Sequence, residues 1–397
     1  MKPSIHSLPV SGIPALDFLR KLFTLSSLLE FRLIRMKNFY FIILCACVIA
    51  NSACVKEVPI ADHHRRQFHE ETDVYVAGQF QNVLDMTMTG FTAAYWKNGN
   101  YVPLTDGTTR ANAQAIAATR HDVFVAGYID NQAAFWKNGH LTLLTNGKVT
   151  SFANSIFLSD RDIYIAGAEG NMAKYWKNGD PVTLGEGVIN SIIVERENVY
   201  AAGENGNNEG GYWKNGHWVP IVDLKGPTYV KSIAVEGHDI YVAGAVTIDN
   251  FGTTIATYWK NGVAVHLDDP NSPSFSASFA ESIAVSGRHI DICGWEAGGD
   301  NLLNRYWKDG VGTSLPGFLD NSQGNSIAIS GNDVYIAGFS FDFAFSDAVL
   351  WKNGEATELF GPPGVTLTQA LANCVFVFKS EEKREHEFEH FEGYEKY

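Results

Sequence analysis

The chain has 397 residues with a formal net charge of −14, and 45% of its residues are hydrophobic. This charge argues against a nucleic-acid partner, because binding to phosphates needs a basic surface. The five cysteines are too few for a disulfide scaffold, and Cys45, Cys47 and Cys54 lie in or just after one apolar run near the N-terminus.

Residues 36–54, MKNFYFIILCACVIANSAC, have the layout of a secretory signal. Lys37 gives the positive start, and the apolar run after it is too short for a transmembrane helix, which needs about 20 residues. Small residues then lead to Cys54. Two interpretations stay open: Cys54 is the lipidated first residue of a bacterial lipoprotein, or cleavage falls near Ala53 and the protein is secreted.

Residues 1–35 precede this signal, although a signal should start at the N-terminus. We therefore expect translation to begin at Met36, with residues 1–35 an upstream artefact or a disordered stretch. The alternative is a longer signal-anchor through Leu16 to Leu33, but charged residues interrupt that run. Residues 55–72 are expected to be a linker.

Two short motifs alternate along the rest of the chain, and each occurs seven times. The first has the form DVYVAG and begins at Asp73, Asp122, Asp162, Asn198, Asp239, His289 and Asp333. The second has the form YWKNG, with its tryptophan at Trp96, Trp136, Trp176, Trp213, Trp259, Trp307 and Trp351. A self-similar unit of about 40 to 45 residues is the signature of a repeat architecture.

Each unit is interpreted as four short strands. VYVAG and AAYW are rich in β-branched and aromatic residues, Asn-Gly after Trp-Lys favours a tight hairpin turn, and a short outer strand follows. A loop then leads to an inner strand of the type NSIAV, which turns into the next VYVAG. The prediction is an all-β protein with one seven-bladed β-propeller of four-stranded antiparallel blades over residues 73–378. The charged residues 379–397 are expected to be a disordered tail.

The first unit has no inner strand before Asp73, whereas an extra copy, ANCVFVF, stands alone at residues 372–378. We expect this C-terminal strand to complete the first blade and to close the ring, which leaves no unpaired inner edge. Cys293 and Cys374 would then lie in the sixth and first blades, which are not adjacent, so no disulfide between them is expected.

On these motifs the chain resembles surface lipoproteins of Gram-negative bacteria that carry tandem DVYVAG…YWKNG repeats, and the resemblance covers residues 73–378. It is more distantly similar to Trp-Asp-repeat and kelch-like propellers, but Trp-Lys replaces Trp-Asp, and the Gly-His pair and the kelch double glycine are absent. The resemblance implies a propeller and a place in the cell envelope, as an outer-membrane lipoprotein. The alternative location is periplasmic or secreted. No particular activity is implied.

The repeated residues are interpreted as structural. The seven tryptophans are expected to fill the core between blades rather than to stack on sugars. The lysine after each tryptophan is expected to be a solvated turn residue. The aspartate that opens most DVYVAG motifs is expected to bond nearby backbone amides.

Ligand binding is expected where the repeats differ, in the loops between second and third strands, which vary most. These loops carry acidic residues, no Lys or Arg, and aromatic rings that include Trp295 and Phe341, so they predict an acidic, aromatic-rich face. A polar residue also recurs at one position of the inner strands: Gln114, Asn154, Asn190, Lys231, Glu281, Asn325 and Asn373. These residues are expected either to bond loop ends or to form a ring for a polar ligand, with Lys231 and Glu281 as its asymmetric members.

No Ser-His-Asp or metal-ligand spacing stands out, so no catalytic residue, metal site or cofactor is predicted, and only calcium is left open. The leading hypothesis is a non-enzymatic binding or interaction module of the cell envelope, presenting its acidic, aromatic-rich face to a glycan or protein ligand. One alternative is a polysaccharide-active hydrolase or lyase of the β-propeller kind, which would use Glu281 and a loop carboxylate. The other is a structural scaffold of an envelope complex. The expected partners are an envelope protein or glycan, and the membrane through a lipid anchor if Cys54 is modified.

Overall fold

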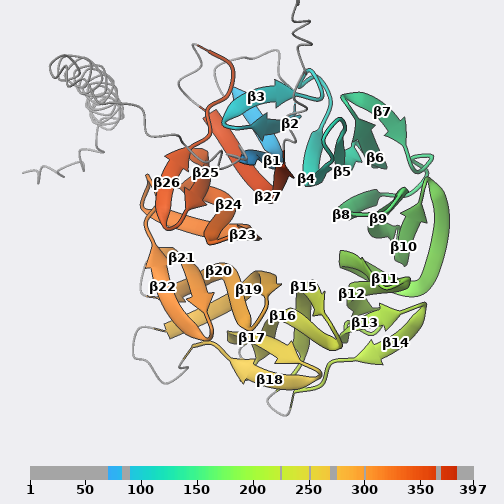
Figure 1. The fold of residues 1–397 in the computed structure, drawn as a ribbon, viewed down its shortest axis with the longest axis vertical. Coiled ribbons are helices and arrows are strands. Elements are labelled where there is room, and N and C mark those ends of the chain that lie inside the picture. The colour runs from blue at the N-terminus through green and yellow to red at the C-terminus, as the bar shows by residue number, and fades with distance from the viewer. Residues whose placement is uncertain are drawn as a thin grey trace, which may run out of the picture. The chain divides into compact units, whose positions relative to one another are not determined.

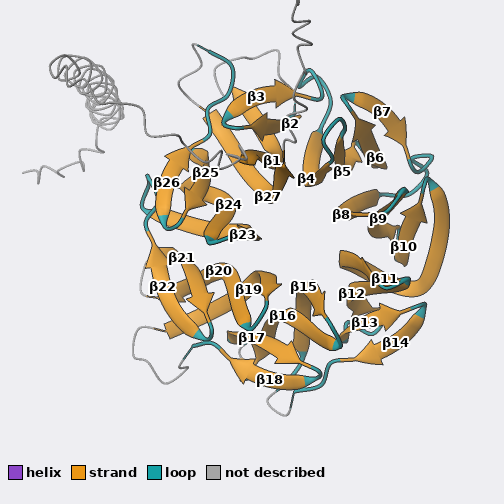
Figure 2. Cartoon of the chain, in the orientation of Figure 1, coloured by secondary structure: helices purple, strands orange, loops and turns teal. Residues whose placement is uncertain are grey.

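The structure is a computed structural model that describes residues 70–82, 90–223, 226–249, 252–268, 275–298, 301–363 and 368–381. The chain divides into two units, Met1–Gln67 and Phe68–Tyr397, and all described residues belong to the second. Every regular element in these ranges is a β-strand, as Figure 2 shows. None of the described segments is a helix that could cross a membrane. The predicted signal and Cys54 lie outside the described residues.

Each copy of the two motifs forms a strand. The DVYVAG motifs form the second strands: β1 (Glu70–Asn82), β5 (Val123–Ile129), β9 (Asp162–Glu169), β12 (Asn198–Asn205), β16 (Asp239–Thr247), β20 (His289–Gly298) and β24 (Asp333–Phe341). The YWK segments end the third strands: β2 (Thr92–Lys97), β6 (Gln132–Lys137), β10 (Met172–Lys177), β13 (Gly210–Lys214), β17 (Thr254–Lys260), β21 (Asn301–Lys308) and β25 (Ser346–Lys352).

The predicted inner and outer strands are present as well. The inner strands are β4 (Ala111–Ala118), β8 (Ser151–Ser159), β15 (Thr228–Glu236), β19 (Phe275–Ser286), β23 (Asn321–Ser330) and β27 (Thr368–Glu381). The outer strands are β3 (Asn100–Pro103), β7 (His140–Leu143), β14 (His217–Pro220), β18 (Val263–His266), β22 (Val311–Leu315) and β26 (Glu355–Glu358). One long strand, β11 (Asp180–Glu195), takes both roles, because its first half pairs with β10 and its second half with β12.

Strand pairing joins the described strands into five sheets, and the two motifs divide these sheets into seven repeats. Repeat 1 is β27, β1, β2 and β3; repeat 2 is β4 to β7; repeat 3 is β8, β9, β10 and the first half of β11; repeat 4 is the second half of β11 with β12 to β14; repeats 5, 6 and 7 are β15 to β18, β19 to β22 and β23 to β26. Neighbouring strands within a repeat are antiparallel. In Figure 1 the repeats follow one another around a common centre, towards which the inner strands lie.

The C-terminal strand pairs with the first strand, as the sequence predicts. β27 and β1 are antiparallel along their whole length, from Glu70 opposite Glu381 to Asn82 opposite Thr368. β1 therefore begins before residue 73, the predicted start of the repeats, and β27 ends after residue 378, their predicted end. The ladder between the two strands continues into the expected linker and the expected tail. In Figure 1 the red β27 lies beside the blue β1.

The core lies between the repeats. Seven buried clusters occur among the described residues, and each joins two consecutive repeats. One of them packs Ile156 and Trp176 of repeat 3 against Phe124 of repeat 2. Another packs Tyr335 of repeat 7 against Val76 of repeat 1, so the last repeat packs on the first.

The seven repeated tryptophans are core residues, which confirms the structural interpretation. The most exposed of them, Trp213, has 3% of its surface accessible. A buried aromatic side chain of this size contributes a large apolar area to the contact between repeats. The tryptophans are therefore not available to stack on a ligand.

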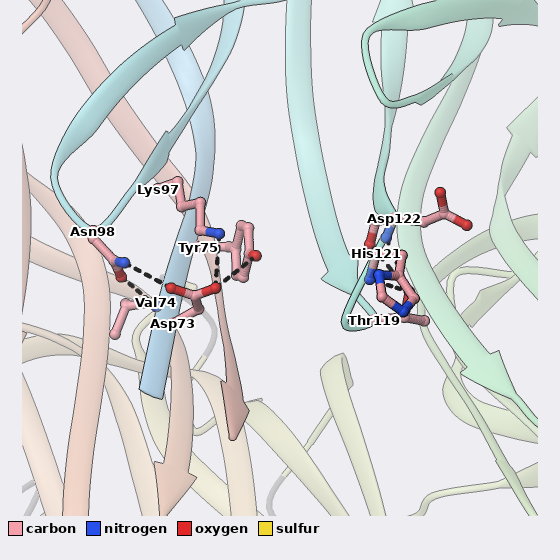
Figure 3. Close-up of polar contacts among 8 residues, drawn as sticks. All are labelled: Asp73, Val74, Tyr75, Lys97, Asn98, Thr119, His121 and Asp122. Atoms are coloured by element: carbon pink, nitrogen blue, oxygen red, sulfur yellow. Dashed lines mark hydrogen bonds and ion pairs between the residues drawn. The ribbon is translucent and has the colours of Figure 1, made fainter. Parts of the chain in front are cut away.

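The two motifs recur together because they meet in one turn cluster, shown for repeat 1 in Figure 3. Asn98 of the Lys-Asn-Gly turn accepts the amide of Val74 at 2.8 Å and donates to the Asp73 carboxylate at 2.7 Å. The Lys97 ammonium lies 2.7 Å from the same carboxylate and over the Tyr75 ring. Asn98 and Gly99 both have positive φ, 51° and 79°, as this tight turn requires.

Two predictions about these turns are corrected by this geometry. In repeats 1, 2, 3, 5 and 7 the lysine is ion-paired with the opening aspartate, at most 3.0 Å away, rather than merely solvated. The aspartate carboxylate accepts a hydrogen bond from the asparagine side chain. The asparagine side-chain oxygen accepts one from the backbone amide of the residue that follows the aspartate. The hydrogen bond from Asn138 lowers the pKa of Asp122, and that from Lys177 lowers the pKa of Asp162. Both motifs are needed for each cluster, which explains why they recur as a pair.

Candidate functional site

The seven polar residues of the predicted ring occupy the same irregularity of the strand ladder. Pairing between β4 and β5 shifts register between Ala113 and Ala115, so Gln114 has no partner across the ladder. The equivalent shift occurs at the other six positions. Each residue is therefore the extra residue of a β-bulge, a feature that redirects a side chain. The bulges lie towards the end of the repeats where second strands pass into third strands, called here the loop face. The opposite end, with the Lys-Asn-Gly turns, is the turn face.

Four of these side chains are bonded to the next repeat. Their amide nitrogens donate to the carbonyl oxygen just before the equivalent residue: Asn154 to Ile189 (3.0 Å), Asn190 to Val230 (2.7 Å), Asn325 to Ala372 (2.9 Å) and Asn373 to Ala113 (2.9 Å). This is the hydrogen-bonding role that the sequence left open for them. Their role in ligand binding stays a prediction.

A second series of hydrogen bonds joins the inner strands beside the first. A serine follows the bulge residue in repeats 3 to 7, and its hydroxyl accepts a hydrogen bond from a backbone amide of the next repeat: Ser155 from Ile192, Ser191 from Ile233, Ser232 from Ile283, Ser282 from Ile327 and Ser326 from Val375, at 3.1 to 3.4 Å. The series runs from repeat 3 to repeat 7 and on to β27 of repeat 1. These hydrogen bonds hold neighbouring inner strands together beside the bulge residues.

Lys231 and Glu281 do not make these contacts and meet each other instead. Glu281 accepts a hydrogen bond from the indole nitrogen of Trp295 at 3.0 Å, and its other oxygen lies 3.9 Å from the Lys231 ammonium. Phe279 stacks on Trp295 with ring centres 5.2 Å apart, and Tyr229 lies 5.9 Å from Phe279 on the other side. We call Tyr229, Lys231, Phe279, Glu281 and Trp295 the aromatic–charged cluster. It joins repeats 5 and 6 on the loop face.

The cluster combines accessible ring surface with opposite charges. Tyr229 is 39% exposed, and Lys231 and Trp295 are half-buried. The Lys231 ammonium also lies 5.8 Å from the centre of the Phe279 ring. Sequence reasoning found Lys231, Glu281 and Trp295 but missed Tyr229 and Phe279. Their positions could have identified them, because each stands two residues before a residue of the predicted polar ring and side chains two apart on a strand point to the same side.

Glu204 of repeat 4 extends the polar surface next to this cluster. Its carboxylate accepts the amide of Val230 at 3.0 Å and the side-chain amide of Asn190 at 3.0 Å. Burial raises the pKa of Glu204, and the nearby Lys231 charge opposes that shift. The Lys231 charge therefore interacts with two carboxylates, Glu204 of repeat 4 and Glu281 of repeat 6.

The loop face is less acidic and less aromatic than predicted. Cations from the third strands neutralise two of the loop carboxylates: Lys174 pairs with Glu169, and Arg305 lies 3.0 Å from Glu296. Tyr128 is only 8% exposed and has the Arg110 guanidinium over its ring. The prediction counted residues between strands, whereas these cations lie in or just before strands and reach the loops from there.

Phe341, the remaining predicted site residue, belongs to repeat 7. Its ring centre lies 5.4 Å from that of Phe339, and neither ring contacts the aromatic–charged cluster. Gln114 belongs to repeat 2, which is not a neighbour of repeats 5 and 6, where the cluster lies. The structure therefore brings together only part of the predicted site.

In the part of the chain that the structure describes, no group of three or more His, Cys, Asp or Glu side chains could hold a metal ion. Glu281 is bonded to Trp295 and Lys231, and no second carboxylate contacts it among the described residues. Three further residues of the loops between second and third strands, Asp85, Phe251 and Asp300, lie outside the described residues.

No protein-family model matches the chain, and no curated protein matches it in sequence. Among solved structures it is similar to TolB from Acinetobacter baumannii, with a TM-score of 0.43 and 11% identity over 76% of this chain and 66% of that chain. It is also similar to a chain of a nidogen/laminin complex, with a TM-score of 0.39 and 9% identity over 77% and 98% of the two chains. Likenesses this slight transfer no function to the present protein.

Proposed function

We propose that the described residues form a closed seven-bladed β-propeller, in which β27 is the inner strand of the first blade. The packing of repeat 7 on repeat 1 supports this arrangement. So do the hydrogen bonds that tie β27 to both neighbours: Asn325 to Ala372 on one side, and Asn373 to Ala113 on the other. A linear array of repeats would leave backbone N–H and C=O groups unpaired at its first strand, and closure by β27 pairs them.

On this scaffold the loop face is a non-enzymatic binding module for a glycan. The observation that carries this proposal is the aromatic–charged cluster. Its rings offer flat apolar surface for the C–H faces of a sugar, and Lys231 and Glu281 supply a donor and an acceptor beside them. Small-ligand sites typically combine aromatic surface with a small number of polar groups held at fixed positions. A protein ligand is the alternative, and the same cluster could anchor it.

A glycoside hydrolase or lyase is the second candidate function, and Glu204 is the observation in its favour. Burial raises the pKa of Glu204, as it does for the general acid of such enzymes, and Glu281 of the aromatic–charged cluster would be the second carboxylate. Against it, both carboxylates already hold protein donors. Loss of polysaccharide cleavage in a Glu204→Gln variant, with binding retained, would establish the enzyme and overturn the binding module.

The double variant Lys231→Ala and Glu281→Gln is expected to weaken glycan binding at least tenfold while thermal unfolding stays nearly unchanged. The pair is partly exposed, and such ion pairs stabilise folds by at most about 1 kcal/mol. Affinity is measured by titration with the glycan selected from an array. Gln114→Ala is the matched control, because it changes the same bulge position in a repeat outside the cluster. Unchanged affinity in the double variant, or a loss of stability equal to the loss of binding, would rule out this site.

We further propose that the protein acts in the cell envelope as an outer-membrane lipoprotein anchored through Cys54. The signal-like residues 36–54 support this location. Mass spectrometry of the membrane fraction is expected to find a diacylglyceryl group on Cys54, and Cys54→Ser should release the protein from membranes. An unmodified mature protein in the soluble fraction would point to the periplasmic or secreted alternative.

A further inference from the structure

Repeat 6 departs from the other repeats in its turn cluster. The third residue of DVYVAG is an aromatic ring in six repeats, namely Tyr75, Phe124, Tyr164, Tyr200, Tyr241 and Tyr335, but it is Asp291 in repeat 6. Each of the six rings is buried in the cluster between its own repeat and the next. Each also lies under a lysine ammonium, 5.1 to 5.3 Å from the ring centre.

The contacts around Asp291 are rearranged accordingly. Its carboxylate is 2% exposed and accepts a hydrogen bond from the Tyr306 hydroxyl. The usual aspartate and asparagine are replaced by His289 and Asp309, which contact each other at 2.9 Å. Lys308, the lysine of this repeat, therefore has neither an ion-pair partner nor a ring beneath it among the described residues.

A cavity of about 270 Å³ lies between repeats 6 and 7. Its walls include Tyr306, Leu315 and Trp351, whose counterparts Tyr95, Leu104 and Trp136 belong to the cluster that contains Tyr75. Tyr306, Leu315, Ile336 and Trp351 give it apolar and aromatic walls, and Lys308 lines it on the turn face. An apolar cavity of about 150 Å³ is large enough to hold benzene in a folded protein. The space is therefore ample for one six-membered ring.

We propose that this cavity binds a phenol-type aromatic ring, which takes the place of the missing tyrosine. The other six repeats support this proposal, because in each the third residue of the DVYVAG motif places an aromatic ring under a lysine ammonium. Lys308 supplies the cation for the ring face. Asn332 also lines the cavity and supplies polar groups for the phenol hydroxyl. The site is separate from the aromatic–charged cluster, which lies on the opposite face and in other strands.

The test is titration of the full chain with p-cresol, the side-chain analogue of tyrosine, followed by calorimetry and thermal unfolding. Saturable binding that shifts the unfolding temperature is expected, and 4-methylcyclohexanol, of similar size but without a π face, should bind more weakly. Asp291→Tyr fills the cavity as in the other repeats and should abolish binding. Lys308→Met keeps the aliphatic stem and should weaken binding about two- to fivefold through loss of the cation–π contact.

Thermal unfolding of each variant shows whether it folds, and Lys308→Met tests the site even if Asp291→Tyr is misfolded. Equal binding of p-cresol and 4-methylcyclohexanol, or unchanged p-cresol affinity in both variants, would overturn the proposal. The peptide Gly-Tyr-Gly distinguishes the source of the ring. Binding of the peptide assigns the cavity to a tyrosine side chain of a partner, and binding of p-cresol alone assigns it to a free phenol. Binding of neither refutes the site.

Discussion

A chain that ends at residue 367, and so lacks β27, is expected to lose cooperative unfolding altogether. The deletion removes the partner of β1 along its whole length and takes Ala370, Ala372 and Val375 out of the core between repeats 7 and 1. It also breaks the hydrogen bonds that join β27 to Ser326 and Asn325. The edge of β1 would remain unpaired along its whole length, and such edges promote aggregation.

Urea unfolding followed by tryptophan fluorescence measures this effect, because the slope of the transition reports the surface that unfolds cooperatively. The matched control ends at residue 381 and removes only the charged tail. That control should retain the midpoint and slope of the full chain. A sharp transition of normal slope in the shorter chain would refute the closure of the propeller by β27.

Replacement of Trp176 by alanine is expected to lower the free energy of unfolding by about 3–5 kcal/mol. Trp176 is 1% exposed and packs with Ile156 and Ile165 against Phe124 of the preceding repeat. The cost combines lost apolar burial with the cavity left between two repeats, which rigid strands cannot close. A loss of this size is a large fraction of the free energy of unfolding of a typical domain, which is about 5–15 kcal/mol.

Chemical denaturation of the variant and the full chain side by side checks this value. Leu141→Ala is the control, because Leu141 is 45% exposed on an outer strand and its loss should change stability by no more than about 0.5 kcal/mol. A Trp176→Ala protein as stable as the parent would mean that the tryptophans do not form the core.

Much of the fold follows from the repeated motifs, because strand propensity, the Asn-Gly turn and the buried tryptophan are local signals that recur in every unit. The partner of the C-terminal strand could be inferred as well, since the first repeat lacks the element that the C-terminus duplicates. Sequence alone could not join Asp162 to Lys177 and Asn178, although all three belong to the motifs, because their contact depends on the twist and register of paired strands.

The candidate site was predictable only in part for a related reason. Lys231 and Glu281 were singled out as the odd members of a repeated position, but their contact exists only because repeats 5 and 6 are neighbours in space. The bulge that presents them is a property of strand pairing, not of composition. The missing tyrosine at Asp291 was visible in the aligned motifs, yet only packing shows that a cavity results.

The pairing of Glu70 with Glu381 also brings the two ends of the described strands together. β1 begins beside the Lys-Asn-Gly turn, since Val74 bonds Asn98, so the chain enters and leaves the described strands on the turn face. The loop face, which carries the aromatic–charged cluster, is therefore the end of the repeats that lies away from both of these points.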